Sequence, residues 1–302
     1  MTRQALTEVS VEPEKRFSNS GAWKRFKKNK LALFGAIVLS ILVIAAILAP
    51  VISPYDPYIS QTKPDGGYNV HASPSAEHLL GTDSLGRDLL SRIIYGGRVS
   101  LSVAFVAVMI ATITGVVLGM IAGYYGRWVD TLIMRITDIV ICFPVLFLAI
   151  SIATILKPSI FNVMIIIGLV SWTTMTRLVR GEVLRVRETE YIEAAKAMGQ
   201  NNFIIIAKHI LPNIMAPIVV QATLQTAEAI LTESSLSFLG VGVQQPVPSW
   251  GNMLYEATSI MVLQFKPWVW APAGFAILIT ILCINFVGDG LRDALDPKTK
   301  KD

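Results

Sequence analysis

Long runs of uncharged, mostly apolar residues alternate with polar segments along the chain. Five runs carry no charge and are long enough to cross a membrane as helices. A sixth run is mostly apolar, although Glu228 and Glu233 interrupt it. The pattern therefore predicts six transmembrane helices. The expected spans are about 31–52, 99–123, 137–156, 160–178, 213–239 and 268–288.

The composition supports this interpretation. Hydrophobic residues make up 53% of the 302 residues and charged residues 16%, whereas soluble domains are about 45–50% apolar and about 25% charged. We therefore expect an all-α polytopic membrane protein. The cysteines, Cys142 and Cys283, both fall in predicted spans and are expected to be packing residues.

The distribution of positive charge predicts the topology. With the N-terminus inside the cell, 20 of the 26 Lys and Arg residues fall on the cytoplasmic side and six on the other side. This bias places both termini in the cytoplasm. The basic residues of 24–30 are interpreted as an anchor on anionic lipid, and no nucleic-acid role is expected.

The chain divides into a leader, a six-span domain and a tail. Residues 1–30 form the leader, whose polar part, 1–22, is expected to be disordered and whose end is amphipathic. The six-span domain covers 31–290 and contains a long cytoplasmic loop at 177–212, and the tail covers 290–302. Prolines are expected to bend spans three and five, at Pro144 and Pro217.

Small residues recur at every fourth position of span two, namely Ala111, Gly115, Gly119 and Gly123. Such a stripe lets two helix backbones approach closely in a membrane. Glycine is also generally common in membrane helices, but the regular spacing favours a helix-packing face.

The 177–212 loop contains one short helical pattern. Tyr191, Ala195 and Met198 lie at i, i+4 and i+7 and form a narrow apolar stripe, and Gly199 follows where a helix C-cap is expected. An isolated helix this short is marginal in water. We therefore expect it to dock on another surface.

Enzyme motifs are absent from the sequence. It contains no phosphate loop of the form G-x-x-x-x-G-K-[ST], no H-E-x-x-H and no G-x-S-x-G. The histidines, His71, His78 and His209, are scattered, so no catalytic, cofactor or metal residue is predicted. No duplication of the two halves is visible, which weakens the case for a carrier built on inverted repeats.

The segment EAAKAMGQNNFIIIAKHILP at 193–212 resembles the EAA loop of ABC importer permeases. It departs from the pattern at His209, where the family has isoleucine. Further segments at 81–104, 236–242, 249–254 and 285–297 resemble the second permease subunit of the dipeptide/oligopeptide/nickel group. The matching loop residues are Glu193, Ala194, Ala195, Gly199, Leu211 and Pro212.

The resemblance implies a type I ABC importer permease fold in the plasma (inner) membrane of a prokaryote. It implies a homologous sister permease, two cytoplasmic ATPases that hold ATP and Mg²⁺, and an extracellular or periplasmic solute-binding protein. It also implies that residues 190–198 are the coupling helix in a groove of one ATPase. There Glu193 would meet a basic residue, Ala194 and Ala195 would permit close approach, and Gly199 would allow a sharp exit.

Glu228 and Glu233 are candidates for the translocation pathway, because acids at membrane depth are commonly functional. From a cytoplasmic entry near Asn213, they are expected about 22 and 30 Å along the span. Glu228 either meets a peptide amino group or is paired at a subunit interface. For Glu233, which adjoins Ser234 and other serines, a structural role is favoured.

Two other groups are expected on the external side. Asp83, Arg87 and Asp88 form either a local ion-paired turn, which is favoured, or a contact with the binding protein. Three tryptophans are expected as interfacial anchors. They are Trp250, Trp268 and Trp270.

The resulting functional prediction is a permease subunit of an ATP-driven importer of di- or oligopeptides. Within the same fold, nickel, an opine or glutathione are alternative substrates. An ion-coupled secondary transporter is a remote alternative, because it would leave the EAA loop without a purpose.

Overall fold

The computed structural model describes residues 19–62, 66–156 and 159–295, and this part of the chain is helical apart from turns and two isolated β-bridges. The polar leader before residue 19 and the tail after residue 295 lie outside the described residues. The helices are α1 (Asn19–Lys28), α2 (Lys30–Ile47), α3 (Ala49–Ile52), α4 (Leu89–Tyr125), α5 (Arg127–Ile141), α6 (Val145–Ile155), α7 (Ile160–Arg187), α8 (Glu190–Ala197), α9 (Asn202–Ile204), the π-helix η1 (Ile205–Ile210), α10 (Leu211–Phe238), α11 (Trp250–Leu254), the 3₁₀ turn η2 (Tyr255–Thr258), α12 (Ile260–Phe265) and α13 (Pro267–Leu295).

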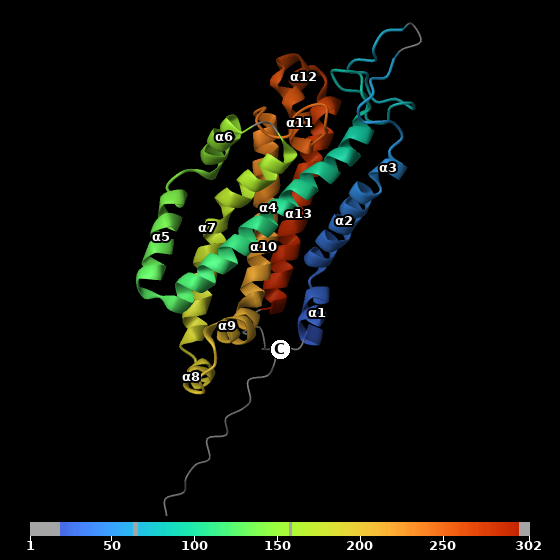
Figure 1. Ribbon diagram of the computed structural model, residues 1–302. Helices are drawn as coiled ribbons and strands as arrows, with labels where there is room; N and C mark the ends of the chain where they lie inside the picture. Colours follow the sequence, from blue (N-terminus) through green and yellow to red (C-terminus); the bar gives the residue numbers. More distant parts are fainter. Residues whose placement is uncertain (1–18, 63–65, 157–158, 296–302) are drawn as a thin grey trace, which may run out of the picture.

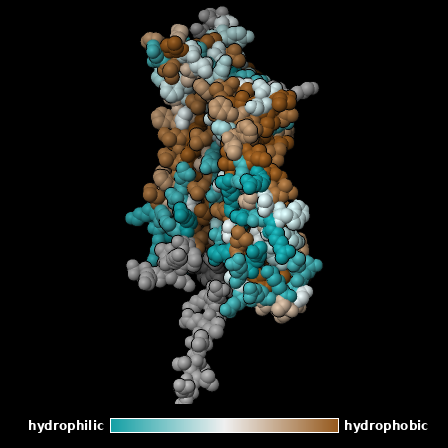
Figure 2. Space-filling model, turned by 90° about the vertical axis from the view of Figure 1, so that its left-hand side faces the viewer, coloured by the Kyte–Doolittle hydropathy of each residue, from teal (hydrophilic) through white to brown (hydrophobic). Residues whose placement is uncertain are grey.

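The long helices form one elongated bundle (Figure 1). Helices α8 and α9 lie at one end, here called the α8 end, and α11 and α12 lie at the other, the α11 end. Helix α2 lies on one flank of the bundle, and the α5–α6 pair lies on the opposite flank. Figure 2 shows a band of hydrophobic residues between two more hydrophilic ends, as expected for a bundle that crosses a membrane.

Five helical segments within the described residues are long and apolar enough to span a membrane: α2, α4, α7, the 202–238 segment that ends in α10, and α13. The α5–α6 pair makes a sixth span if it is counted as one, but its halves meet at 85°. The bend expected at Pro144 is therefore observed, and it divides the expected span at 137–156 into α5 and α6. Pro144 lies at the break, directly before α6, and its backbone is extended. Proline has no N–H to donate within a helix, and it disfavours the helical conformation of the residue before it, so α5 does not continue into α6.

Several helices run further than the sequence pattern indicates. Helix α4 begins at Leu89, well before the expected start of span two at 99, and continues without a break for 37 residues. The Asp88 carboxylate accepts a hydrogen bond from the Ser91 N–H (2.8 Å) and caps its first turn. Helix α7 reaches Arg187, nine residues beyond the expected end of its span, and leads almost directly into α8.

The small-residue stripe of α4 packs on α7. Ala111, Gly115, Gly119 and Gly123 are all buried, and α4 and α7 form the most extensive helix pair in the described bundle. A Cβ added at Gly119 would lie 2.7 Å from the Cβ of Val179, and one at Gly123 would lie 2.7 Å from the Cβ of Val183. Neighbouring α7 side chains thus occupy the space that larger residues would need, and the two backbones lie close together.

Helix α2 has an exposed apolar face, on which Phe34, Ile37 and Ile41 each expose more than half of their surface. Helix α1 meets the bundle differently. Its Phe26 is buried against Ala32 and Ala294, whereas Trp23 is exposed and stacks on Phe26 with ring centroids 5.9 Å apart. This arrangement leaves the basic side of α1 outside the bundle.

We predict that Gly119→Ala lowers the free energy of unfolding by about 1–3 kcal/mol, because the added methyl group overpacks the α4–α7 contact. Chemical unfolding of the purified protein in detergent measures this effect. Gly274→Ala in α13 is the matched control, since its added Cβ would lie no nearer than 3.7 Å to another residue. Equal stability of the two variants would contradict the packing role of the stripe.

Candidate functional site

Helix α8 is anchored to the bundle by one face only. Ile192 and Ala195 are buried, whereas Glu193 and Ala194 between them are exposed. The buried pair belongs to a hydrophobic cluster that joins α8 to the ends of α4, α7 and α10. The cluster includes Tyr124, Val183, Val186, Ile205, Ile210 and Ile214.

The exposed face of α8 differs from the stripe that the sequence predicts. Ala195 is buried in the bundle together with Ile192, three residues earlier on the same face. Of the two alanines expected to permit close approach to the ATPase, only Ala194 is exposed. Tyr191 is 39% exposed and Met198 is 72% exposed. These two side chains are therefore left on the outside of the described chain, beside the exposed Glu193.

The C-terminus of α8 is a Schellman motif. The Gln200 N–H donates to the Ala195 carbonyl (3.1 Å), and the Gly199 N–H donates to the Lys196 carbonyl (2.9 Å). Gly199 has φ = +73°, and a Cβ placed there would meet no atom within 4 Å. The glycine is therefore required by the backbone and not by crowding.

Two side chains tie α8 and its flanking turns to α4. Arg187 Nη1 donates to the carbonyls of Gly123 (2.9 Å) and Tyr124 (3.2 Å), which satisfies groups that the end of α4 would leave unpaired. The Tyr124 hydroxyl donates to Asn202 Oδ1 (2.7 Å), and the Lys196 ammonium lies 5.5 Å from the centre of the Tyr124 ring. The α8 end is thus one connected joint.

His209, the position that departs from the EAA pattern, lies in the π-helix η1. Its Nε2 is 3.0 Å from Gln200 Oε1, so the histidine bonds to the turn that follows α8. Its carbonyl accepts a hydrogen bond from Asn213 Nδ2 (2.7 Å), which also lies 3.2 Å from the Tyr191 hydroxyl. The departure leaves the loop intact, because the imidazole has polar partners within it.

Glu233 lies inside the bundle. Its side chain is fully buried, and its carboxylate accepts hydrogen bonds from Ser100 (2.9 Å) and Ser237 (2.8 Å). Ser100 also accepts a hydrogen bond from the Trp250 N–H (3.2 Å). Glu233 thereby joins α4, α10 and α11, and it is not on an open face of the described chain.

Glu228 occupies a different environment, because it is exposed and makes no side-chain hydrogen bond or ion pair with the described residues. Its level in the bundle follows from Gln225, whose Nε2 donates to the Ser171 carbonyl of α7 (2.9 Å). Ser171 is about 16 Å from the start of α7, and Glu228 lies one turn further along α10, toward the α11 end. Glu233, which contacts Ser100 near the start of the apolar run of α4, lies five residues closer to the α11 end. Glu228 is therefore inside the apolar band, in its half nearer the α11 end.

The depth expected for Glu228 from a membrane entry at Asn213, about 22 Å along the span, stays a prediction. The first turn of α10 lies at the α8 end, because Ile210 and Ile214 cluster with Val183 and Val186.

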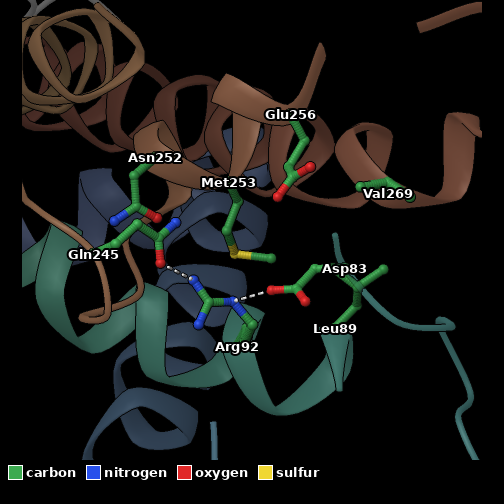
Figure 3. A pocket seen from close by; sticks show the side chains of 8 residues that line it. All are labelled: Asp83, Leu89, Arg92, Gln245, Asn252, Met253, Glu256 and Val269. Atoms are coloured by element: carbon green, nitrogen blue, oxygen red, sulfur yellow. Dashed lines mark hydrogen bonds and ion pairs between the residues drawn. The ribbon is translucent and has the colours of Figure 1, made fainter. Parts of the chain in front are cut away.

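The α11 end contains a buried ionic cluster (Figure 3). Asp83 lies 2.7 Å from Arg87 Nε and 3.3 Å from Arg92 Nε, and Arg92 Nη2 lies 3.3 Å from Gln245 Oε1. Asp88 pairs with His78 (2.9 Å) in addition to capping α4. The geometry agrees with the ion-paired turn, extended by partners that are far away in sequence.

Trp250 also differs from expectation. It is 2% exposed, its indole N–H donates to the Ile93 carbonyl (3.0 Å), and its ring lies against Gly97. It is therefore a core residue and not an interfacial anchor, whereas Trp268 and Trp270 remain partly exposed. No group of His, Cys, Asp or Glu residues is placed to hold a metal ion in the described ranges.

Comparison with known proteins identifies the family. Residues 115–301, more than half of the chain, match the model of the binding-protein-dependent transport system inner membrane component. The chain belongs to this permease family. Residues 20–74 of the permease match the N-terminal transmembrane domain of oligopeptide transport permease C. A permease of this family is the membrane component of a transport system and is not itself an enzyme.

Curated relatives cover nearly the whole permease. The dipeptide transport system permease protein DppC of Alkalihalophilus pseudofirmus is 48% identical over 96% of this chain and 95% of its own. The di/tripeptide transport system permease protein DppC of Pseudomonas aeruginosa is 42% identical, over 92% and 91%. The glutathione transport system permease protein GsiD of Escherichia coli is 41% identical, over 92% and 90%.

The fold also matches a solved transporter. An inward-facing structure of the MetNI methionine ABC transporter superposes with a TM-score of 0.55, covering 69% of this chain and 98% of that chain at 19% identity. This likeness shows the fold, a type I ABC importer permease.

We predict that Asp83→Asn destabilises the permease by about 3 kcal/mol, because it removes the counter-charge of two buried arginines. The free energy of unfolding, measured in detergent, tests this value. Asp56→Asn is the matched control, since Asp56 is exposed in the same segment and accepts a backbone hydrogen bond from Tyr58 that asparagine can also accept. A loss below about 1 kcal/mol for Asp83→Asn would contradict the structural role of the cluster.

Proposed function

We propose that this permease is a subunit of an ATP-driven importer of di- and oligopeptides and forms half of the translocation pathway. A homologous sister permease supplies the other half, two cytoplasmic ATPases hold ATP and Mg²⁺, and an extracellular or periplasmic solute-binding protein delivers the peptide. The chain itself binds no cofactor. The substrate class is supported by relatives at 40–48% identity that are named as dipeptide or peptide permeases.

The α8 end is proposed to face the cytoplasm, as are both termini. Arginines concentrated at this end support the orientation, because positive residues are enriched on the cytoplasmic side. Five of them lie on α5 and the last turns of α7: Arg127, Arg135, Arg180, Arg185 and Arg187.

Helix α8 is proposed to dock in a groove of one ATPase. The observation that carries this proposal is the two-sided character of α8, with Ile192 and Ala195 buried in the bundle and Tyr191 and Met198 exposed at its tip. Exposed apolar side chains at an end outside the hydrophobic band are typical of a protein interface. Glu193 lies beside them and can pair with a basic residue of the groove.

Glutathione is a second candidate substrate, because relatives at 41% identity are named as glutathione permeases. Glutathione is itself a small peptide, so the two candidates share their chemistry. Membership of the permease family weighs against the ion-coupled carrier.

Reconstitution of the complex tests the proposed function. The permease, its sister, the ATPases and the binding protein, placed in liposomes, are expected to take up a labelled dipeptide only with ATP and Mg²⁺. Glutathione and Ni²⁺ are measured in parallel. Uptake by the permease alone, or ATP-dependent uptake of Ni²⁺ without peptide, would contradict peptide import.

We predict that Gly199→Ala weakens the docking of α8 by about tenfold, because a left-handed alanine costs about 1–2 kcal/mol. Retention of the ATPases during affinity purification and ATP-dependent uptake both measure this effect. Gly181→Ala is the matched control, since Gly181 lies inside α7 with no atom within 4 Å of an added Cβ, and alanine favours a helix. Similar behaviour of the two variants would argue against the role of the α8 exit turn.

A further inference from the structure

One edge of α10 is polar at membrane depth and is not covered by the described chain. Helix α10 packs on α4, α7 and α13 through residues that include Gln225, Ala229, Ile230 and Glu233. The remaining edge contains polar residues separated by seven, four and three positions, which places them on one helix face. They are Gln221, Glu228, Thr232 and Ser235, and all four are partly or fully exposed.

Glu228 lies inside the apolar band, where a carboxylate facing lipid is unfavourable, by up to about 2.5–3.5 kcal/mol at the helix centre on insertion scales. An exposed acid at this depth therefore faces water or another protein surface. The three neighbouring polar residues support the same conclusion, because hydroxyl and amide groups also lose hydrogen bonds in hydrocarbon.

Two acids of α5 are paired with arginines of α7. Asp138 pairs with Arg177 (2.5 Å), and Asp130 bonds to Arg180 through a second contact of 2.6 Å. The carboxylate of Glu228 has no such partner in the described ranges. The Thr232 hydroxyl, one turn along the helix, donates a hydrogen bond to the Glu228 backbone carbonyl (2.8 Å). Its charge is left available to a group from outside the chain.

We propose that Glu228 is a binding subsite for the α-ammonium group of the peptide in transit, a proposal that rests on the proposed function. An α-amino group has a pKa near 8, so it is mostly charged at neutral pH. A carboxylate then offers it a charge-assisted hydrogen bond, and the hydroxyls of Thr232 and Ser235 add neutral acceptors along the same edge. One charge with open surroundings binds the ammonium group weakly enough to release it.

The first test measures the electrostatic potential at this edge. Thr232→Cys, one turn from Glu228, is introduced into the assembled complex after Cys142→Ser and Cys283→Ala. Cationic and anionic methanethiosulfonate reagents are then compared. We expect the cationic reagent to react about tenfold faster, and this ratio to fall toward one when Glu228→Gln is added. No reaction with either water-soluble reagent, or a ratio unchanged by Glu228→Gln, would overturn the proposal.

The second test measures transport. Glu228→Gln is expected to raise the KM for dipeptide uptake about tenfold, with the complex still assembled, and Glu228→Asp is expected to restore most of the affinity. Glu77→Gln, in the exposed segment before α4, is the matched control.

The outcomes separate the two proposals. Failure of the wild-type complex to import peptide would contradict the proposed function itself. Normal wild-type import with an unchanged KM for Glu228→Gln would contradict only the subsite. Loss of the sister permease from the Glu228→Gln complex would identify Glu228 as an interface residue and would also overturn the subsite.

Discussion

The close contact between α4 and α7 is the constraint on which the rest of the bundle depends. Lipid provides no hydrophobic driving force between helices, so their association relies on fitted surfaces and on polar contacts. The small residues of α4 provide such a surface over four successive turns. This contact fixes α7 along its length, and α7 in turn places α8 at one end and supplies the Ser171 carbonyl that sets the level of α10.

Buried polar contacts hold together parts of the bundle that apolar packing alone would not fix. Glu233 joins α4, α10 and α11 through serine hydroxyls. Asp83 pairs with Arg87 and Arg92, which lie on either side of the start of α4. Each buried acid is satisfied by several donors, as low-dielectric surroundings require. Glu228, on the same helix as Glu233, is exposed and has no such donors among the described residues. The contrast between two acids five residues apart is what separates a structural group from a candidate ligand.

Much of this arrangement could be predicted from the sequence because it is periodic or local. Apolar runs indicate the spans, the four-residue spacing indicates the α4 face, and the EAA segment indicates α8 and its glycine exit. Pro144 indicates a bend in span three, but the angle of 85° could not be predicted, because it depends on where neighbouring helices hold the chain. Partners such as Ser100 for Glu233, or Asn202 for Tyr124, are far away in sequence and leave no local signal.

The joint at the α8 end has a mechanical consequence. Arg187, the last residue of α7, donates to carbonyls at the end of α4, while the Tyr124 hydroxyl of α4 donates to Asn202 in the segment that leads into α10. A push on α8 therefore cannot be absorbed by one helix alone. Because these contacts join α4, α7 and the segment before α10, we expect a displacement of α8 to be transmitted to all three membrane helices.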